Sequence, residues 1–329
     1  MNRKIALYLF FALLLLAVVI FSLLVGSGKI SIAQVFSVLG SRSNDLNSTI
    51  IWEIRIPRIV LSIFVGIGLS LSGCIFQNIL RNPLADPYTL GISGGAALGT
   101  TLGIVTNLAR VSIAFLPICA FAGAFVSIIL VYFISANKRF SNHVMILGGV
   151  ILGFVFSAMV LLIFSLVSAD KIQSALMWLL GDLSSADNLL IAIVGSVVIV
   201  GGVLIAVFSR DLDTLMLGDE KSLSLGLNPS RIRAAFFITA SLITAACVSA
   251  SGIIGFVGLI IPHFVRKLVG NNHLNLILLS SIIGATFLTL CDTLSRTIIS
   301  PIELPVGVIT GILGGIFLLI FLLKGDEGL

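Results

Sequence analysis

Nine stretches of this 329-residue sequence contain no Asp, Glu, Lys or Arg over at least 20 residues. They are residues 5–28, 59–80, 87–109, 111–137, 140–169, 188–209, 234–265, 268–291 and 304–323. A helix needs about 20 apolar residues to cross the ~30 Å hydrocarbon core of a bilayer, and it satisfies its own backbone there. The pattern predicts an all-α polytopic membrane protein.

The composition excludes several other classes of protein. The chain is 58% hydrophobic and 10% charged, whereas soluble domains carry about 25% charged residues. Its cations stand at the ends of apolar runs, which marks membrane boundaries and gives no sign of a nucleic-acid surface. The four Cys and three His residues show no disulfide or metal-ligand spacing, so we expect no metal and no cofactor. The apolar run from residue 5 is too long for a signal peptide and predicts a retained first membrane helix.

The window 234–265 is too long for one straight crossing, because 32 residues would extend about 48 Å. Gly252, Gly255, Gly258 and Pro262 should break it into two helices. Nine windows then become ten transmembrane helices. The window 140–169 lacks a comparable breaker and predicts a single helix.

The distribution of cations supports ten helices over nine. With the N-terminus in the cytoplasm, ten helices place 12 of the 19 Lys and Arg residues inside, whereas nine would leave only 9 inside. Cytoplasmic loops carry the excess of positive charge. We therefore expect both termini in the cytoplasm, residues 29–57 outside and residues 209–233 inside.

Three arginines lie at the predicted outer surface. Arg55 and Arg58 are three residues apart and share a face of a helix start, and Arg296 lies near the outer end of another helix. From the residues alone, they either contact lipid headgroups or dock an acidic partner.

The longest inside loop predicts two short amphipathic helices. Leu212, Leu215 and Met216 recur at helical spacing, and Gly218 and Gly226 mark two helix ends. Such helices either lie on the membrane surface or form a knob that fits a groove on another protein. The sequence has no G-x-x-x-x-G-K-[ST] phosphate-binding loop, so ATP-driven transport would need a separate ATPase subunit.

Two glycine stripes occur at four-residue spacing, at 91, 95, 99 and 103 and again at 307, 311 and 315. Such stripes allow helix backbones to approach closely in lipid. Packing within one subunit and a seam between two subunits both remain open.

Several strings occur in one order along essentially the whole chain: RIPR at 55–58, SGCIFQ at 72–77, RNPLADP at 81–87, WLLG at 178–181, GIIGFVGL at 252–259 and ELPVG at 303–307. Together they resemble the FecCD/BtuC-type permeases of ABC importers for iron-siderophore, haem and vitamin B12. The resemblance implies one transmembrane permease domain over residues 1–329, of the type II ABC importer kind, in a bacterial or archaeal plasma membrane. It also implies a second permease copy, two ABC ATPase subunits and an extracytoplasmic substrate-binding protein.

The same resemblance assigns three sets of residues. Docking of the binding protein falls on Arg55, Arg58 and Arg296. It assigns the contact with the ATPase to helices at about 211–227, which include Leu215, Gly218, Asp219, Glu220, Leu225 and Gly226. The gate falls on Asn82, Pro83, Leu84, Ser141 and Asn142. The expected cargo is an iron-siderophore, with haem, vitamin B12 and oxyanions such as molybdate as alternatives, and the chain itself is not expected to be an enzyme.

Two other functions fit the sequence less well. An ion-coupled secondary transporter should carry ionisable residues in mid-membrane. The candidate is Asp292, but it lies near the outer end beside Arg296, which favours a partner or capping role. An intramembrane enzyme would need paired catalytic groups such as H-E-x-x-H, and the sequence contains none.

Overall fold

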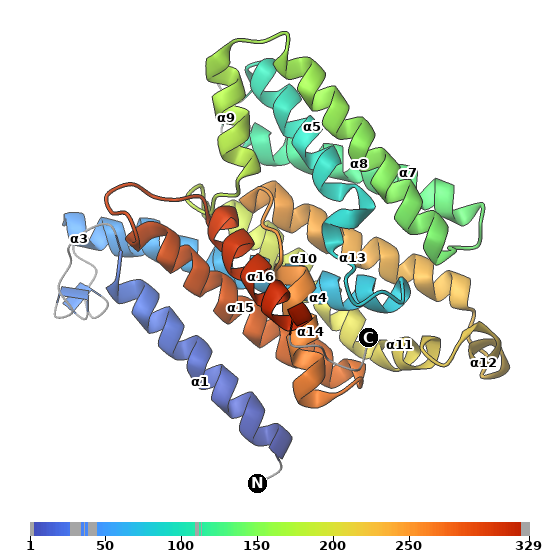
Figure 1. Cartoon of the computed structure of the whole chain (residues 1–329). Helices are drawn as coiled ribbons and strands as arrows, with labels where there is room; N and C mark the ends of the chain where they lie inside the picture. Colours follow the sequence, from blue (N-terminus) through green and yellow to red (C-terminus); the bar gives the residue numbers. More distant parts are fainter. Residues whose placement is uncertain are drawn as a thin grey trace.

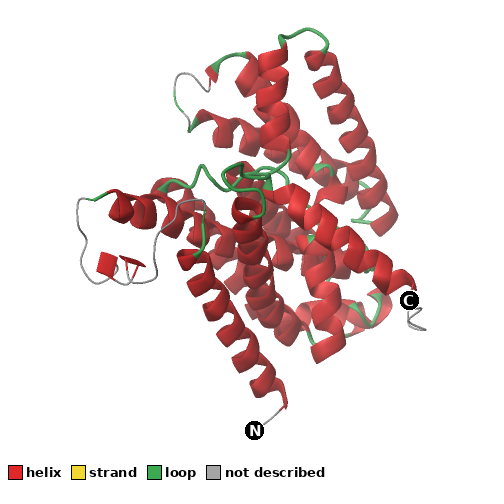
Figure 2. Ribbon diagram, turned by 60° about the vertical axis from the view of Figure 1, so that its left-hand side comes forward, coloured by secondary structure: helices red, strands yellow, loops and turns green. Residues whose placement is uncertain are grey.

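A computed structural model describes residues 3–26, 34–35, 37–38, 45–108, 112 and 114–323. Within these residues the chain forms helices joined by turns, without a β-strand (Figures 1 and 2). The elements are α1 Arg3–Leu24, α3 Leu46–Thr49, the π-helix η1 Ile50–Arg55, α4 Ile56–Ile79, the 3-10 helix η2 Pro87–Leu90, α5 Ile92–Val105, α7 Phe115–Ala136, α8 Asn142–Phe164, α9 Ala169–Leu179, α10 Asn188–Val207, α11 Ser209–Leu215, α12 Asp219–Ser224, α13 Pro229–Ser251, α14 Val257–Val269, α15 His273–Thr297 and α16 Val306–Leu323.

Each charge-free window coincides with a helix, and the window 234–265 coincides with two, as predicted. Helix α13 ends at Ser251, Gly252 follows with φ +67°, and α14 begins at Val257. The hydroxyl of Tyr88 donates to Ile254 O at 3.1 Å and accepts from Ile254 N–H at 3.2 Å. One side chain thereby satisfies backbone groups that the break removes from helical hydrogen bonding.

The number of crossings stays a prediction. Among the described residues, 7 helices are long and apolar enough to cross a membrane. Helices α5 and α14 have only 14 and 13 residues, and 13 residues span about 20 Å. Four cations used for the orientation, Lys29, Arg42, Arg110 and Lys324, lie outside the described residues.

Helix α4 forms the centre of the bundle, and glycines set its distance from two neighbours. Gly66 lies against Gly284 of α15, where an added Cβ would meet Gly284 O at 2.4 Å. Gly73 lies against Gly258 of α14, where an added Cβ would meet Gly258 O at 1.8 Å. Helix backbones can approach this closely only where neither carries a side chain.

The two glycine stripes differ in their surroundings. On α5, an added Cβ at Gly95 or Gly99 would lie within 2.4 Å of a backbone oxygen of α7. This stripe therefore packs within one chain, and Figure 1 shows α5, α7, α8 and α9 grouped together. On α16, an added Cβ at Gly311 or Gly315 would meet nothing within 4 Å.

Gln77 of α4 repairs the helix defect caused by Pro262 in α14. Proline has no N–H, so the carbonyl four residues earlier, that of Gly258, loses its helical donor. Gln77 Nε2 lies 3.3 Å from Gly258 O and 3.0 Å from Leu259 O, and Gln77 Oε1 accepts from Arg266 at 3.2 Å. One buried amide thus joins α4 to α14.

We expect Gln77→Leu to lower the free energy of unfolding by about 1–3 kcal/mol, because the carbonyl of Gly258 and the guanidinium of Arg266 lose the hydrogen bonds that Gln77 makes to them. Gln173→Leu is the matched control, since Gln173 is exposed on α9. Thermal unfolding in detergent measures both variants. Equal unfolding temperatures for the two would contradict the repair role of Gln77.

Candidate functional site

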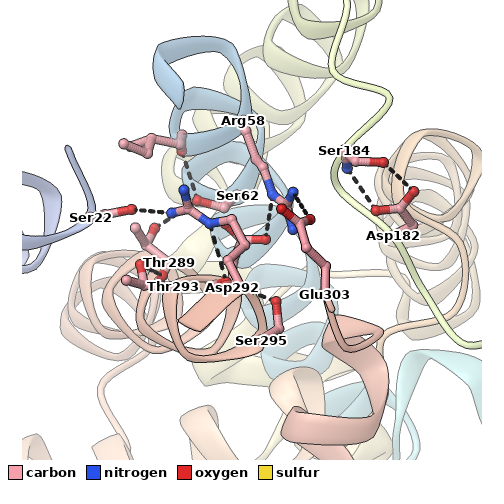
Figure 3. Close-up of polar contacts among 12 residues, drawn as sticks. Ser22, Arg58, Ser62, Asp182, Ser184, Thr289, Asp292, Thr293, Ser295 and Glu303 are labelled. Carbon is pink, nitrogen blue, oxygen red and sulfur yellow. Dashed lines mark hydrogen bonds and ion pairs between the residues drawn. The ribbon is translucent and has the colours of Figure 1, made fainter. Parts of the chain in front are cut away.

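The predicted docking arginines meet at one end of the bundle, which we call the arginine end and define by Arg55, Arg58 and Arg296. Arg58 Nε lies 2.9 Å from Asp292 Oδ1, and its Nη1 lies 2.7 Å from Glu303 Oε2 (Figure 3). Arg296 Nε lies 3.2 Å from Asp292 Oδ2, one turn away on α15. One carboxylate therefore pairs with two guanidinium groups.

All three arginines are buried, with exposed fractions of 2–4%. Arg55 Nη1 donates to Leu23 O at 2.6 Å, and Arg296 Nη2 donates to Ser22 Oγ at 2.7 Å, so both are tied to α1. We expected these side chains to be exposed at the outer surface, but in the structure they are buried within the helix bundle. The burial of Arg58 and Arg296 is possible because Asp292, itself fully buried, compensates their charge. The partner role that we expected for Asp292 is confirmed.

Glu303 is the reachable member of this cluster. Its side chain is 37% exposed, whereas that of Arg58 is 5% exposed. A molecule in solution can therefore contact the glutamate directly, whereas the Arg58 guanidinium is almost fully covered.

The opposite end, which we call the loop end, carries the predicted amphipathic segment as two short helices, α11 and α12. Leu215 is buried at the end of α11. Gly218 has φ +103° and Gly226 has φ +82°, a region that favours glycine. Both were predicted as helix stops, and the structure confirms this. Around them, large apolar side chains stay more than half exposed: Met216, Leu217, Leu223 and Leu225.

Asp219 fixes α12 to the bundle. Its carboxylate lies 2.9 Å from Arg81 Nη2 and 3.0 Å from Arg233 Nη1. The hydrogen bond from Arg233, with the charges of both arginines, holds the pKa of Asp219 below its usual range. Glu220, its neighbour in the first turn of α12, is exposed.

A second cluster at the loop end joins three elements. Asp213 of α11 places Oδ1 at 2.6 Å from His273 Nδ1 and 3.1 Å from the His273 backbone N. Asn78 Nδ2 lies 2.7 Å from His273 Nε2. His273 had shown no ligand spacing in the sequence, and its partners lie 60 and 195 residues away. The only sequence signal was that Asn78 and His273 both stand at predicted inside ends of helices.

The predicted gate residues fall in two turns. Asn82 Oδ1 accepts from Leu84 N at 2.9 Å, which forms a tight turn after α4 with Leu84 exposed. Ser141 precedes α8, and Asn142 begins it. The structure shows no hydrogen bond between the two turns within the part of the chain that it describes.

Comparison with known proteins gives the family to which this sequence belongs. The sequence matches the FecCD transport family over residues 14–324. It is 37% identical over 92% of this chain and 89% of the relative to an uncharacterized ABC transporter permease protein, YvrB, of Bacillus subtilis. It is 40% identical over 76% of both chains to a Helicobacter pylori protein named as a probable iron chelatin transport system permease.

A solved structure agrees over nearly the whole chain. A metal-chelate type ABC transporter in an inward-facing conformation matches with a TM-score of 0.87 and 30% identity, over 97% of this chain and 99% of that one. The relatives are ABC permeases, and the 7 apolar helices make this chain a multi-pass membrane protein. The chain belongs to the FecCD transport family.

Proposed function

We propose that this chain is the permease subunit of an ATP-driven importer that carries a ferric chelate across the plasma membrane of a bacterium or archaeon. The observation that carries the proposal is the likeness, over 97% of the chain, to a metal-chelate type ABC transporter. The Helicobacter pylori relative named for iron chelatin supports the same class of cargo. In this proposal the chain crosses the membrane ten times with both termini in the cytoplasm.

Reconstitution tests the cargo and the energy source together. The permease, its ATPase subunits and its binding protein are placed in liposomes, and uptake of a labelled ferric siderophore is compared with that of haem, vitamin B12 and molybdate. We expect uptake of the siderophore that requires ATP and resists a proton ionophore. Uptake that needs a proton gradient and no ATP would instead establish an ion-coupled secondary transporter.

The loop end is the proposed contact with the ATPase. Its support is the set of exposed apolar side chains on α12 and in the turns that follow α11 and α12, together with the absence of a phosphate-binding loop in the sequence. The ion pairs of Asp219 hold α12 in place, and the exposed apolar side chains around it are suited to bind in a groove on a partner protein. A pair of ATPase subunits would meet a pair of permeases, one at each loop end.

We expect Leu223→Asp to weaken association with the ATPase about tenfold or more, because it places a charge in the buried part of that contact. Leu46→Asp is the matched control, since Leu46 is 75% exposed at the arginine end. Co-purification and binding titrations in detergent measure both. An unchanged affinity for Leu223→Asp would place the ATPase contact elsewhere.

The arginine end is the proposed dock for the binding protein. In this proposal an acidic side chain of the binding protein replaces Glu303 beside Arg58, while Arg55 and Arg296 supply further positive charge. Electrostatic complementarity of this kind mainly sets the association rate. Asp292 stays in place as the internal partner.

We expect Glu303→Gln to raise the association rate of the binding protein about twofold or more at low salt, because a competing carboxylate loses its charge. Glu53→Gln removes the same charge from an exposed glutamate at the same end and separates this effect from net charge. Stopped-flow binding at several salt concentrations measures both. A slower rate for Glu303→Gln than for Glu53→Gln would show that Glu303 does not compete.

The remaining assignments stay proposals with narrower support. The open glycine stripe at Gly311 and Gly315 of α16 is compatible with a close seam between two permease copies. The turns at residues 82–84 and 141–142 are proposed as the inner gate, since both lie at helix ends.

A further inference from the structure

Helices α4 and α15 are joined at three levels along their length. At the loop end, Asn78 of α4 donates to His273 of α15 at 2.7 Å. In the middle, Gly66 and Gly284 bring the two backbones together. At the arginine end, Arg58 of α4 pairs with Asp292 of α15 at 2.9 Å. Two packed helices fixed at both ends and in the middle resist sliding and splaying.

The loop-end contact has a defined direction of hydrogen bonding. A carboxylate can only accept, so the His273 ring proton sits on Nδ1 and is donated to Asp213. The bare Nε2 then accepts from the Asn78 amide. His273 is 2% exposed and Asn78 is 6% exposed, which makes an unpaired state of either side chain costly.

Asp213 belongs to α11, outside the helix pair. Its Oδ1 accepts from both the ring Nδ1 and the backbone N–H of His273, the first residue of α15. A carboxylate at a helix N-terminus is favoured by the orphan N–H groups and by the helix dipole. A displacement of α11 therefore acts on the first turn of α15 and, through the His273 ring, on α4.

We propose that α4 and α15 move as one rigid unit that connects the two ends of the permease. The hydrogen-bonded group of Asp213, His273 and Asn78, which we call the joint, transmits a movement of the loop end to this unit. The inference rests on the proposed function, because it assumes that the ATPase moves α11. Asp213 and His273 are then positioning residues, which convert a movement at the loop end into a movement of the Arg58–Asp292 pair.

The test measures cargo delivered per ATP hydrolysed by the whole transporter in liposomes, with a labelled ferric siderophore as the probe. We expect Asp213→Ala to lower this ratio about fivefold or more while ATP hydrolysis continues, the size of a typical coupling effect between sites. Asp213→Asn keeps an acceptor for the Nδ1 proton and should recover part of the ratio. Asp211→Ala, on the same helix and outside this joint, should keep the wild-type ratio.

Three outcomes separate the possibilities. A wild-type ratio in an assembled Asp213→Ala transporter overturns the joint and leaves the proposed function intact. Absence of ATP-dependent uptake by the wild-type transporter overturns the proposed function itself. If Asp213→Ala does not assemble, Asn78→Ala decides in the same assay, because it removes only the arm to α4; an unchanged ratio there also overturns the joint.

Discussion

Asp292→Ala is expected to lower the free energy of unfolding by about 3–5 kcal/mol, because it leaves buried positive charge without its partner. Asp292 is fully buried, and it pairs with Arg58 and Arg296, whose side chains are 5% and 4% exposed. Among the described residues, Arg58 would then keep only Glu303, and Arg296 would keep the hydroxyl of Ser22 and the backbone carbonyl of residue 292, neutral groups both. None of these contacts replaces a shared buried carboxylate.

Denaturant unfolding in detergent, followed by circular dichroism, measures this loss. Asp182→Ala is the control, because Asp182 is exposed and its carboxylate accepts hydrogen bonds, among the described residues, only from Ser184 within its own turn (Figure 3). It should cost about 1 kcal/mol or less. If Asp292→Ala cost no more than Asp182→Ala, the arginine end would be held together by something other than this ion cluster.

Gly73→Ala is expected to destabilise the bundle by about 3 kcal/mol or more, at or above the upper end of ordinary overpacking. The new Cβ would lie 1.8 Å from Gly258 O and 2.6 Å from Gly258 C. Because both atoms belong to backbone, no side chain can turn away, so α4 and α14 must separate. That separation would also stretch the bonds from Gln77 to the same segment of α14.

Gly153→Ala is the matched comparison, since it makes the same change within α8, where the nearest atom to the added Cβ is 4.0 Å away. It should be neutral or stabilising by about 0.5–1 kcal/mol, because alanine restricts the unfolded chain. The two variants are compared by unfolding temperature and by the fraction that elutes as folded protein. Similar behaviour of the two would contradict the close contact between α4 and α14.

The positions of most helices along the chain could be predicted from the sequence, because they depend on local features of the sequence. Runs without charge mark nine windows, and the glycines around Gly252 mark the break between α13 and α14. Gly218 and Gly226 likewise mark the ends of α11 and α12. Helix α9 was missed because Asp170 and Lys171 interrupt its apolar pattern.

The partners of buried polar groups could not be predicted, because they depend on distant contacts. Arg58 and Asp292 are separated by 234 residues, so nothing in the sequence indicated that Arg58 and Arg296 share a buried carboxylate. His273 looked isolated for the same reason. The charge-free windows also predicted helices that are longer than those in the structure, since the window of 23 residues at 87–109 contains an α5 of only 14 residues.

The glycine contacts of α4 have a consequence for how this protein can be altered. Because Gly66 and Gly73 meet backbone on two different neighbours, side-chain volume, more than hydrophobicity, limits substitution along this helix. Random mutagenesis should therefore recover few active variants on that face of α4. Helix α1, whose apolar stretch is only 11% buried, should accept many changes among apolar residues.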